Sequence, residues 1–294
     1  LEKFIDLKSF GVIHAHYWLS GLVAKEISNE LNIPFIFTSH SLGVFLDGYN
    51  KERVDCEKIV MTSSNLVTTS SVFETMLIGD TYKIDENKIK KIIPGIDKKI
   101  FIPDSSVEKE NIILSIGRIQ KQKGQIQTLE FLNNFKKIEK DFKCYFIGGP
   151  SGKNGNEYLN ELKQSVEEFN LNTHVEFLDN LPQTEIIDLF KKAKLMIHTS
   201  QFETFGLVAI EANAMGVPVL TTNNGSLMEI IENNKNGYLS DSLLDGNVNN
   251  FVNNLFNDDA KYEEISSSCI EKSKKYDWVK TTNELESLYK QLVR

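Results

Sequence analysis

The chain has 294 residues, of which 40% are hydrophobic and 25% are charged. This composition is typical of a globular protein, and the length allows two domains that each bury a core of their own. The 33 basic and 41 acidic side chains give a formal net charge of −8. An acidic chain is poorly suited to bind nucleic acid or an anionic membrane through its overall field, so we expect no nucleic-acid partner.

The three cysteines, Cys56, Cys144 and Cys269, are widely separated and form no CxxC pair. This pattern predicts neither a disulfide framework nor a zinc site, and it favours a cytoplasmic location. The apolar stretches are far shorter than the ~20 residues that span a bilayer, so we expect no transmembrane segment. The chain starts at Leu1 without a signal-peptide pattern and as if within a helix, which indicates a fragment or a processed product.

Short apolar runs alternate with longer stretches of helical period along the chain, as in repeated βαβ units with parallel sheets. In the first part we predict strands at residues 11–14, 35–39, 66–69 and 90–93 and helices at residues 20–31, 51–63 and 72–81. These elements amount to about half of a usual doubly wound sheet.

The segment 94–106 contains two prolines and a glycine and is predicted to be a linker. After it we predict strands at residues 111–116, 143–147, 175–178, 195–199, 218–221 and 237–239 and helices at residues 125–135, 156–169, 184–193, 207–215 and 226–232. The Asn-rich stretches 233–236 and 247–254 are interpreted as loops and helix ends. The tail 275–294 is predicted to be a helix, with an apolar stripe of Trp278, Leu285, Leu288 and Leu292.

The fold class is therefore α/β, with two Rossmann-like domains. We expect an N-terminal domain at residues 1–105, a C-terminal domain at residues 106–274, and a closing helix at residues 275–294 that packs back toward the N-terminal domain.

Two cations follow the first strand of the second domain, in Gly117-Arg118 and Lys123-Gly124. Ligands of parallel sheets bind at the carboxyl ends of the strands, where both side chains would emerge. A guanidinium can grip two phosphate oxygens at once, and an ammonium adds a compact second charge. The alternative is that both are solvated surface cations.

The segment from Glu203 to Glu211 follows the strand at 195–199 and turns into a helix. The amides of Phe205, Gly206 and Leu207 at the start of this helix could bind a diphosphate or a sugar. Alternatively, Glu203 caps the helix and Glu211 lies on the surface. Glu211, however, stands within an apolar run, where an unpaired carboxylate is costly to bury.

This set of residues, with Gly216-Val217-Pro218-Val219 after it, resembles the C-terminal domain of retaining GT-B glycosyltransferases of family 4 and includes their E-x7-E signature. The resemblance covers essentially the whole chain. It implies a GT-B fold of two facing Rossmann-like domains with parallel sheets, the N-terminal one truncated.

The resemblance also implies roles for individual residues. Arg118 and Lys123 would hold the donor diphosphate and stabilise the leaving group, Glu203 would face the hydroxyls of the donor sugar, and Glu211 would bind the ribose. The remaining donor-binding residues would be Gly117, Thr204, Phe205, Gly206 and Leu207. Neither a metal nor another cofactor is expected, because the two cations and the helix dipole supply the electrostatic stabilisation.

Two histidine-containing segments follow predicted strands of the first domain, one with His14 and His16 and one with His40 and Ser41. They resemble segments of sucrose-phosphate synthases and of the glycosyltransferases that begin mycothiol and bacillithiol synthesis. The resemblance places His16 beside the transferring sugar as a catalytic residue, and His40 and Ser41 on the acceptor side. A single histidine at a strand end is more often a hydrogen-bonded structural residue.

The chain also departs from the family pattern. The Gly-rich loop that normally follows the first strand of the family's N-terminal domain is not found in this sequence, and we expect the acceptor wall to be partly absent. The usual Gly-Gly before the late Glu229 is replaced by Asn223-Asn224-Gly225-Ser226. Residues 179–184 occupy the place of the nucleotide base, but they do not distinguish uracil from guanine or adenine.

We therefore expect a retaining glycosyltransferase that moves a hexosyl group from a nucleotide-sugar donor, preferably a UDP-sugar, to a sugar, polyol or other hydroxyl acceptor. The alternative is a non-catalytic subunit or fragment that binds a sugar nucleotide. A third, weaker hypothesis is a GT-B epimerase or phosphorylase, although no lysine is marked for pyridoxal phosphate.

Overall fold

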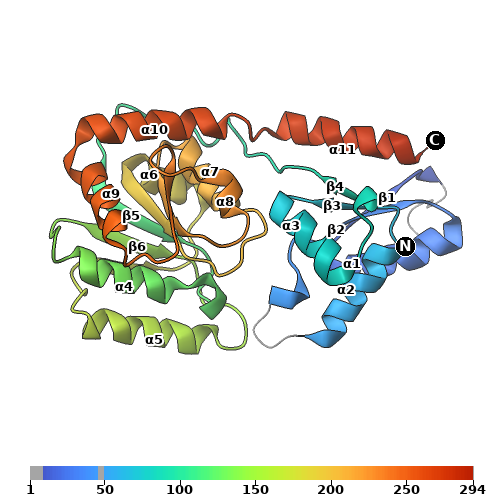
Figure 1. The fold of residues 1–294 in the computed structure, drawn as a ribbon, viewed down its shortest axis with the longest axis horizontal. Helices are drawn as coiled ribbons and strands as arrows, with labels where there is room; N and C mark the ends of the chain where they lie inside the picture. Colours follow the sequence, from blue (N-terminus) through green and yellow to red (C-terminus); the bar gives the residue numbers. More distant parts are fainter. Residues whose placement is uncertain (1–8, 46–49, 294) are drawn as a thin grey trace. The chain divides into compact units, whose positions relative to one another are not determined.

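The computed structural model of the chain describes residues 9–45 and 50–293. The chain divides into two compact units (Figure 1). Unit 1 comprises residues 1–95 and 277–294, and unit 2 comprises residues 96–276. The sequence-based boundaries lie nearby, at 105/106 and 274/275.

Unit 1 is built on a parallel four-stranded sheet with the order β1-β2-β3-β4. Its strands are β1 (Ile13–His16), β2 (Phe35–Thr38), β3 (Leu66–Thr69) and β4 (Ile89–Lys91), and its α-helices are α1 (Trp18–Leu31), α2 (Lys51–Ser63), α3 (Val72–Leu77) and α11 (Trp278–Leu292). The short helices are η2 (Gly43–Phe45), η4 (Glu86–Lys88) and the π-helical η3 (Ile78–Tyr82). Side-chain caps start α2, α3 and α11, since Asn50 accepts from the Arg53 amide, Ser71 from the Glu74 amide and Asp277 from the Val279 amide.

The first strand lies two residues later than predicted, at Ile13–His16 instead of residues 11–14. The prediction was wrong because it ended the strand at His14, whereas the pairing with β2 begins at Ile13 and continues to His16. His14 fits inside the sheet because both ring nitrogens have partners, the Tyr289 hydroxyl at 2.7 Å and Thr38 Oγ1 at 2.8 Å. His16 ends the strand with an exposed side chain.

Helix α11 belongs to unit 1 although the whole of unit 2 separates it from the rest of that unit in sequence. The hydroxyl of Thr281 donates to the carbonyl of Ile93 at 2.7 Å. The start of the helix passes so close to Gly95 that a Cβ there would lie 2.2 Å from the backbone nitrogen of Trp278. Glycine is thus required at position 95 by the close approach of two backbones.

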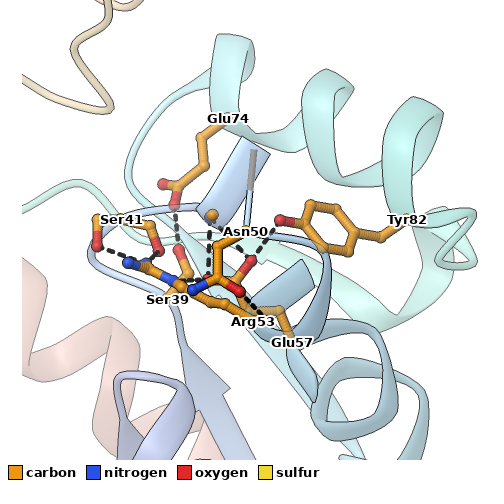
Figure 2. A network of polar contacts seen from close by, with 8 residues as sticks. Ser39, Ser41, Asn50, Arg53, Glu57, Glu74 and Tyr82 are labelled. Carbon is orange, nitrogen blue, oxygen red and sulfur yellow. Dashed lines mark hydrogen bonds and ion pairs between the residues drawn. The ribbon is translucent and has the colours of Figure 1, made fainter. Parts of the chain in front are cut away.

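A buried ion pair on α2 organises the loop after β2 (Figure 2). Arg53 Nε lies 2.7 Å from Glu57 Oε1, and the two side chains are 7% and 1% exposed. Arg53 donates to both the carbonyl and the hydroxyl of Ser41 at 2.9 Å, while Glu57 accepts from the Gly43 amide and the Tyr82 hydroxyl. The pair thereby connects α2 to the loop after β2 and to η3.

Unit 2 contains a parallel six-stranded sheet with the order β10-β9-β8-β5-β6-β7. Its strands are β5 (Glu110–Ile116), β6 (Lys143–Ile147), β7 (Val175–Leu178), β8 (Ala193–His198), β9 (Val219–Thr222) and β10 (Gly237–Ser240). Its helices are α4 (Gln125–Phe135), α5 (Gly155–Glu168), α6 (Gln183–Lys192), α7 (Leu207–Ala214), α8 (Leu227–Ile230), α9 (Gly246–Asn257), α10 (Asp259–Ser273) and the 3₁₀-helix η5 (Lys121–Lys123).

The strand order of unit 2 reverses between β5 and β8. From β5 the chain adds β6 and β7 on one side, and it then returns to add β8, β9 and β10 on the other. Such a reversal is the place where open α/β sheets bind their ligands, at the carboxyl ends of the strands. The loops after β5 and β8 therefore border the expected ligand site.

Helix α9 contradicts the interpretation of residues 247–254 as loops and helix ends. Asp245 caps it by accepting from the Asn247 amide at 2.8 Å. Its buried side chains, Val248, Phe251, Val252, Leu255 and Phe256, recur at helical spacing and join the core of unit 2. Burial of this apolar face outweighs the low helix propensity of asparagine. The following α10 was also missed.

Among the described residues, no helix combines the length and the apolar character needed to span a bilayer.

We expect Glu57→Ala to destabilise unit 1 by about 3–5 kcal/mol, because it leaves the Arg53 guanidinium buried without its partner. Both tryptophans of the chain, Trp18 and Trp278, belong to unit 1, so intrinsic fluorescence during urea unfolding follows this unit. Glu286→Ala is the matched control, because Glu286 pairs with Lys290 at the same i,i+4 spacing on an exposed surface. Equal midpoints for Glu57→Ala and the wild type would contradict a stabilising role for the buried pair.

Candidate active site

The loop after β5 is fixed by its backbone. The Gly117 amide donates to the carbonyl of Ile147, and a Cβ on Gly148 would lie 2.4 Å from the carbonyl oxygen of Gly117. The side-chain amide of Gln125 donates to the carbonyl of Arg118 at 2.9 Å. The Arg118 side chain is exposed, and its guanidinium has no ion-pair or hydrogen-bond partner within residues 9–45 and 50–293.

The loops after β5 and β8 are joined directly. The Gln201 amide donates to the carbonyl of Gln122 at 2.9 Å, and the Thr199 hydroxyl donates to the carbonyl of Lys123 at 3.1 Å. Gly124 has φ +66°, and a Cβ there would lie 2.2 Å from the carbonyl oxygen of Thr199. These contacts place Lys123 against the loop that contains Glu203.

One carboxylate oxygen of Glu203 is within hydrogen-bond distance of two side chains. Lys123 Nζ lies 3.0 Å from Glu203 Oε2, and His198 Nε2 lies 3.1 Å from the same atom. The side chains of Lys123 and Glu203 are 22% and 17% exposed. Burial alone would raise the pKa of Glu203, but its contacts with His198 and Lys123 lower the pKa to about 2. Glu203 is therefore a carboxylate at neutral pH.

The loop after β9, where Asn223-Asn224-Gly225-Ser226 replaces the usual Gly-Gly, contacts the backbone of Glu203. The carbonyl of Glu203 accepts from both the amide and the hydroxyl of Ser226 at 3.0 Å. Gly225 has φ +67°, and a Cβ there would lie 2.5 Å from that same carbonyl oxygen. The one glycine retained in Asn223-Asn224-Gly225-Ser226 thus occupies the position that requires it.

Helix α7 starts at Leu207 after Gly206, whose φ of 92° suits glycine. No side chain caps this helix, so Glu203 is not its cap. Phe205 is buried and meets the ring of Tyr276 edge-on at 6.0 Å, while Leu207 is exposed. Thr204 is half-buried. The first turn of α7 thus offers the amides and the positive end of the helix dipole.

Glu211 lies on α7, about one turn after its start at Leu207, and it is not among the groups that shift the pKa of Glu203. Its side chain is half-buried among buried neighbours, and burial raises the pKa of its carboxyl group. A hydroxyl donor would compensate that cost.

A hollow of about 10 Å³ lies beside these groups and is lined by residues that include Lys123, Gln125, His198 and Ser200. Two buried polar atoms there, Gln125 Oε1 and Ser200 Oγ, have no hydrogen-bond partner among the described residues. A buried polar atom without a partner is costly, so the site has room for a further polar ligand atom.

In unit 1 the structure brings His16 and His40 together. His16 Nδ1 lies 2.7 Å from His40 Nε2, and the two rings stack with centroids 5.0 Å apart. Both side chains are exposed, and burial of part of each ring lowers its pKa, with a further lowering of the His16 pKa by the charge of His40. Ser41 is held by Arg53, as described above.

Sequence reasoning missed two residues that hold the predicted ones in place, His198 and Arg53. His198 is the last residue of β8, and its position at a strand end in the sheet with the cations was the available signal. Arg53 follows the N-cap of α2 and looks like a surface residue, because nothing in its neighbourhood along the chain shows that it is buried.

Two α/β units, each with a parallel sheet, are the architecture of the GT-B fold, which this chain has. Sucrose-phosphate synthase from Thermosynechococcus elongatus superposes with a TM-score of 0.83 at 25% identity, over 96% of this chain and 74% of that protein. The Anabaena protein HepE, in complex with UDP and glucose, superposes with a TM-score of 0.85 at 20% identity, over 97% of this chain and 79% of its own.

Residues 97–276 match the family described as Glycosyl transferases group 1, and residues 1–99 match Glycosyltransferase Family 4. The chain belongs to the group 1 glycosyltransferases and is an enzyme of that class. It is 28% identical to D-inositol 3-phosphate glycosyltransferase from Corynebacterium urealyticum, over 97% of this chain and 72% of that protein. It is 26% identical to mannosylfructose-phosphate synthase from Agrobacterium fabrum, over 79% of this chain and 58% of that protein.

We expect the stability of unit 1 to rise between pH 4 and 6.5. Burial, with smaller effects of His16 and His40, lowers the pKa of His14 from 6.5 to about 4. The unfolded chain therefore binds more protons in this window, so the stabilisation is complete above pH 6.5 and is lost as the pH falls toward 4. The difference corresponds to about 3 kcal/mol.

The measurement is urea unfolding followed by tryptophan fluorescence at several pH values, for the wild type and His14→Gln. The variant should show a shallower rise with pH, while His16 and His40 still contribute. An identical slope in both proteins would show that His14 is not the group responsible.

Proposed function

We propose that this glycosyltransferase moves a hexosyl group from a UDP-sugar to an acceptor hydroxyl with retention of the anomeric configuration. The observation that supports it is the joining of the loops after β5 and β8, which places Lys123 and Glu203 within 3.0 Å of each other at the reversal of the sheet. A cation for the diphosphate and a carboxylate for the sugar are thus presented at the same sheet edge.

Arg118 and Lys123 stabilise the leaving group in this proposal. The Arg118 guanidinium is exposed and has no partner within the described part of the chain, so it can grip two phosphate oxygens without breaking another contact. Lys123 supplies the second charge. The amides at Phe205, Gly206 and Leu207 add donors at the start of α7.

The carboxylates have separate roles. Oε1 of Glu203 has no hydrogen-bond partner among the described residues and can accept from a hydroxyl of the donor sugar. Glu211, whose burial favours a hydroxyl partner, binds the ribose. The acceptor hydroxyl attacks from the face that the diphosphate leaves, so retention requires no covalent nucleophile, and the released proton passes to the leaving phosphate.

The assignment of His16 as a catalytic residue and of His40 and Ser41 to the acceptor side is part of the same proposal and rests on the family resemblance. The choice of UDP is supported by HepE, which shares the fold and has been crystallised with UDP-glucose. A phosphorylated polyol or sugar is the first acceptor to test, because the names of the similar enzymes contain inositol phosphate and mannosylfructose phosphate.

We expect Arg118→Ala to lower kcat/KM by at least about 100-fold, equivalent to about 3 kcal/mol, because it removes a donor aimed at the charge of the leaving diphosphate. Lys121→Ala is the matched control. Lys121 lies in the same loop, but its exposed side chain pairs with Glu161. The measurement is the initial rate of UDP release with a UDP-sugar and each acceptor. An unchanged kcat/KM for Arg118→Ala would refute the proposal.

We expect UDP to stabilise the protein more than GDP or ADP in a thermal-shift screen run in EDTA. A ligand at about 100 times its Kd adds about 2.7 kcal/mol to the free energy of unfolding. EDTA is included because the proposed site uses two cationic side chains in place of a metal. Stabilisation by GDP alone would overturn the choice of base, and stabilisation that requires Mg²⁺ would overturn the metal-free site. Binding of UDP-sugar without turnover would favour a binding role.

A further inference from the structure

His198 contacts the proposed sugar-binding carboxylate, yet the mechanism above gives it no role. It is the last residue of β8, its side chain is 6% exposed, and its Nε2 lies 3.1 Å from Glu203 Oε2. The strand is fixed on both sides, since His198 pairs in register with Thr221 of β9, while β8 also pairs with β5. The position of His198 is therefore fixed by the sheet, whereas the ammonium group of Lys123 is carried on a long flexible side chain.

The two partners of Glu203 differ in what a donor does to them. In the described structure Lys123 Nζ is bound to Glu203 Oε2, the same ammonium that would bind the diphosphate. When Lys123 turns to the phosphate, His198 is the remaining partner of Oε2 within the described part of the chain. A carboxylate that is only 17% exposed requires a donor to stay ionised and in place.

We propose that His198 is a positioning residue that holds Oε2 of Glu203 during catalysis, so that Oε1 stays oriented toward the donor sugar after Lys123 has moved to the diphosphate. This inference rests on the proposed function. It assigns His198 no contact with the substrate.

The charges around Glu203 are few. Its pKa is shifted by His198 and Lys123, against the effect of burial. The nearby elements also carry Glu211 on α7 and Glu229 on α8, and neither is among the groups that shift Glu203. A change in the titration of Glu203 on substitution of His198 therefore reports directly on their contact.

The experiment compares His198→Leu with His198→Gln. Leucine removes the N–H donor, whereas the glutamine amide can place a donor near the position of the imidazole Nε2. We expect His198→Leu to lower kcat by up to about 100-fold with little change in the KM for the donor, because a misplaced group loses transition-state contacts. His198→Gln should restore most of the loss.

The pH profile separates positioning from a general structural role. In His198→Leu, kcat should gain an acid limb at higher pH than kcat/KM does. The reason is that kcat reports the donor complex, where Glu203 has lost both partners, whereas kcat/KM reports the free enzyme, where Lys123 remains. Equal losses of kcat in both variants, with wild-type pH profiles, would overturn the inference.

A second measurement does not depend on turnover. The Glu203 carboxyl signal in ¹³C NMR, assigned with Glu203→Gln, should begin to titrate at higher pH in His198→Leu than in the wild type or His198→Gln. If this shift occurs but no donor is turned over, the proposed function fails and the contact with His198 stands. If the enzyme is active and Arg118→Ala impairs it, an unmoved signal refutes the inference about His198 alone.

Discussion

The pairing of β5 with β8 is the constraint on which the site of unit 2 depends. These strands lie next to each other in the sheet although β6 and β7 come between them in the chain. Their loops are then brought so close that Gly124 tolerates no side chain against the carbonyl of Thr199. The ion pair between Lys123 and Glu203 follows from this close approach, while His198 contacts Glu203 from the end of β8, five residues earlier in the chain.

The parallel α/β character and most elements were predictable from the sequence, because apolar strands and amphipathic helices of unit 2 show their periods plainly. The ends of α4, β6 and β7 were predicted to the residue. Helix α9 was missed because its apolar face is hidden among asparagines. The hydrogen bonds of His14 were not predictable, because its partners include Tyr289 on α11, far along the chain.

The candidate site was likewise predictable only in part. Motif spacing identified Lys123 and Glu203, but their direct contact depends on loop geometry that no local pattern encodes. His198 was missed because its importance comes from the atom it faces. The roles of Arg118 and Glu211 remain predictions that rest on the family resemblance, on the exposed guanidinium and on a carboxyl group whose pKa is raised by burial.

The discontinuity of unit 1 affects the order of folding during synthesis. Unit 2 is one continuous segment, so all of it can leave the ribosome and fold as soon as residue 276 has emerged. Unit 1 must wait for α11, which supplies the Tyr289 partner of His14 and the Thr281 hydrogen bond to Ile93. The first unit to be translated is therefore the last to be completed, and a chain from which residues 277–294 are removed would keep the whole of the second unit beside an unfinished first one.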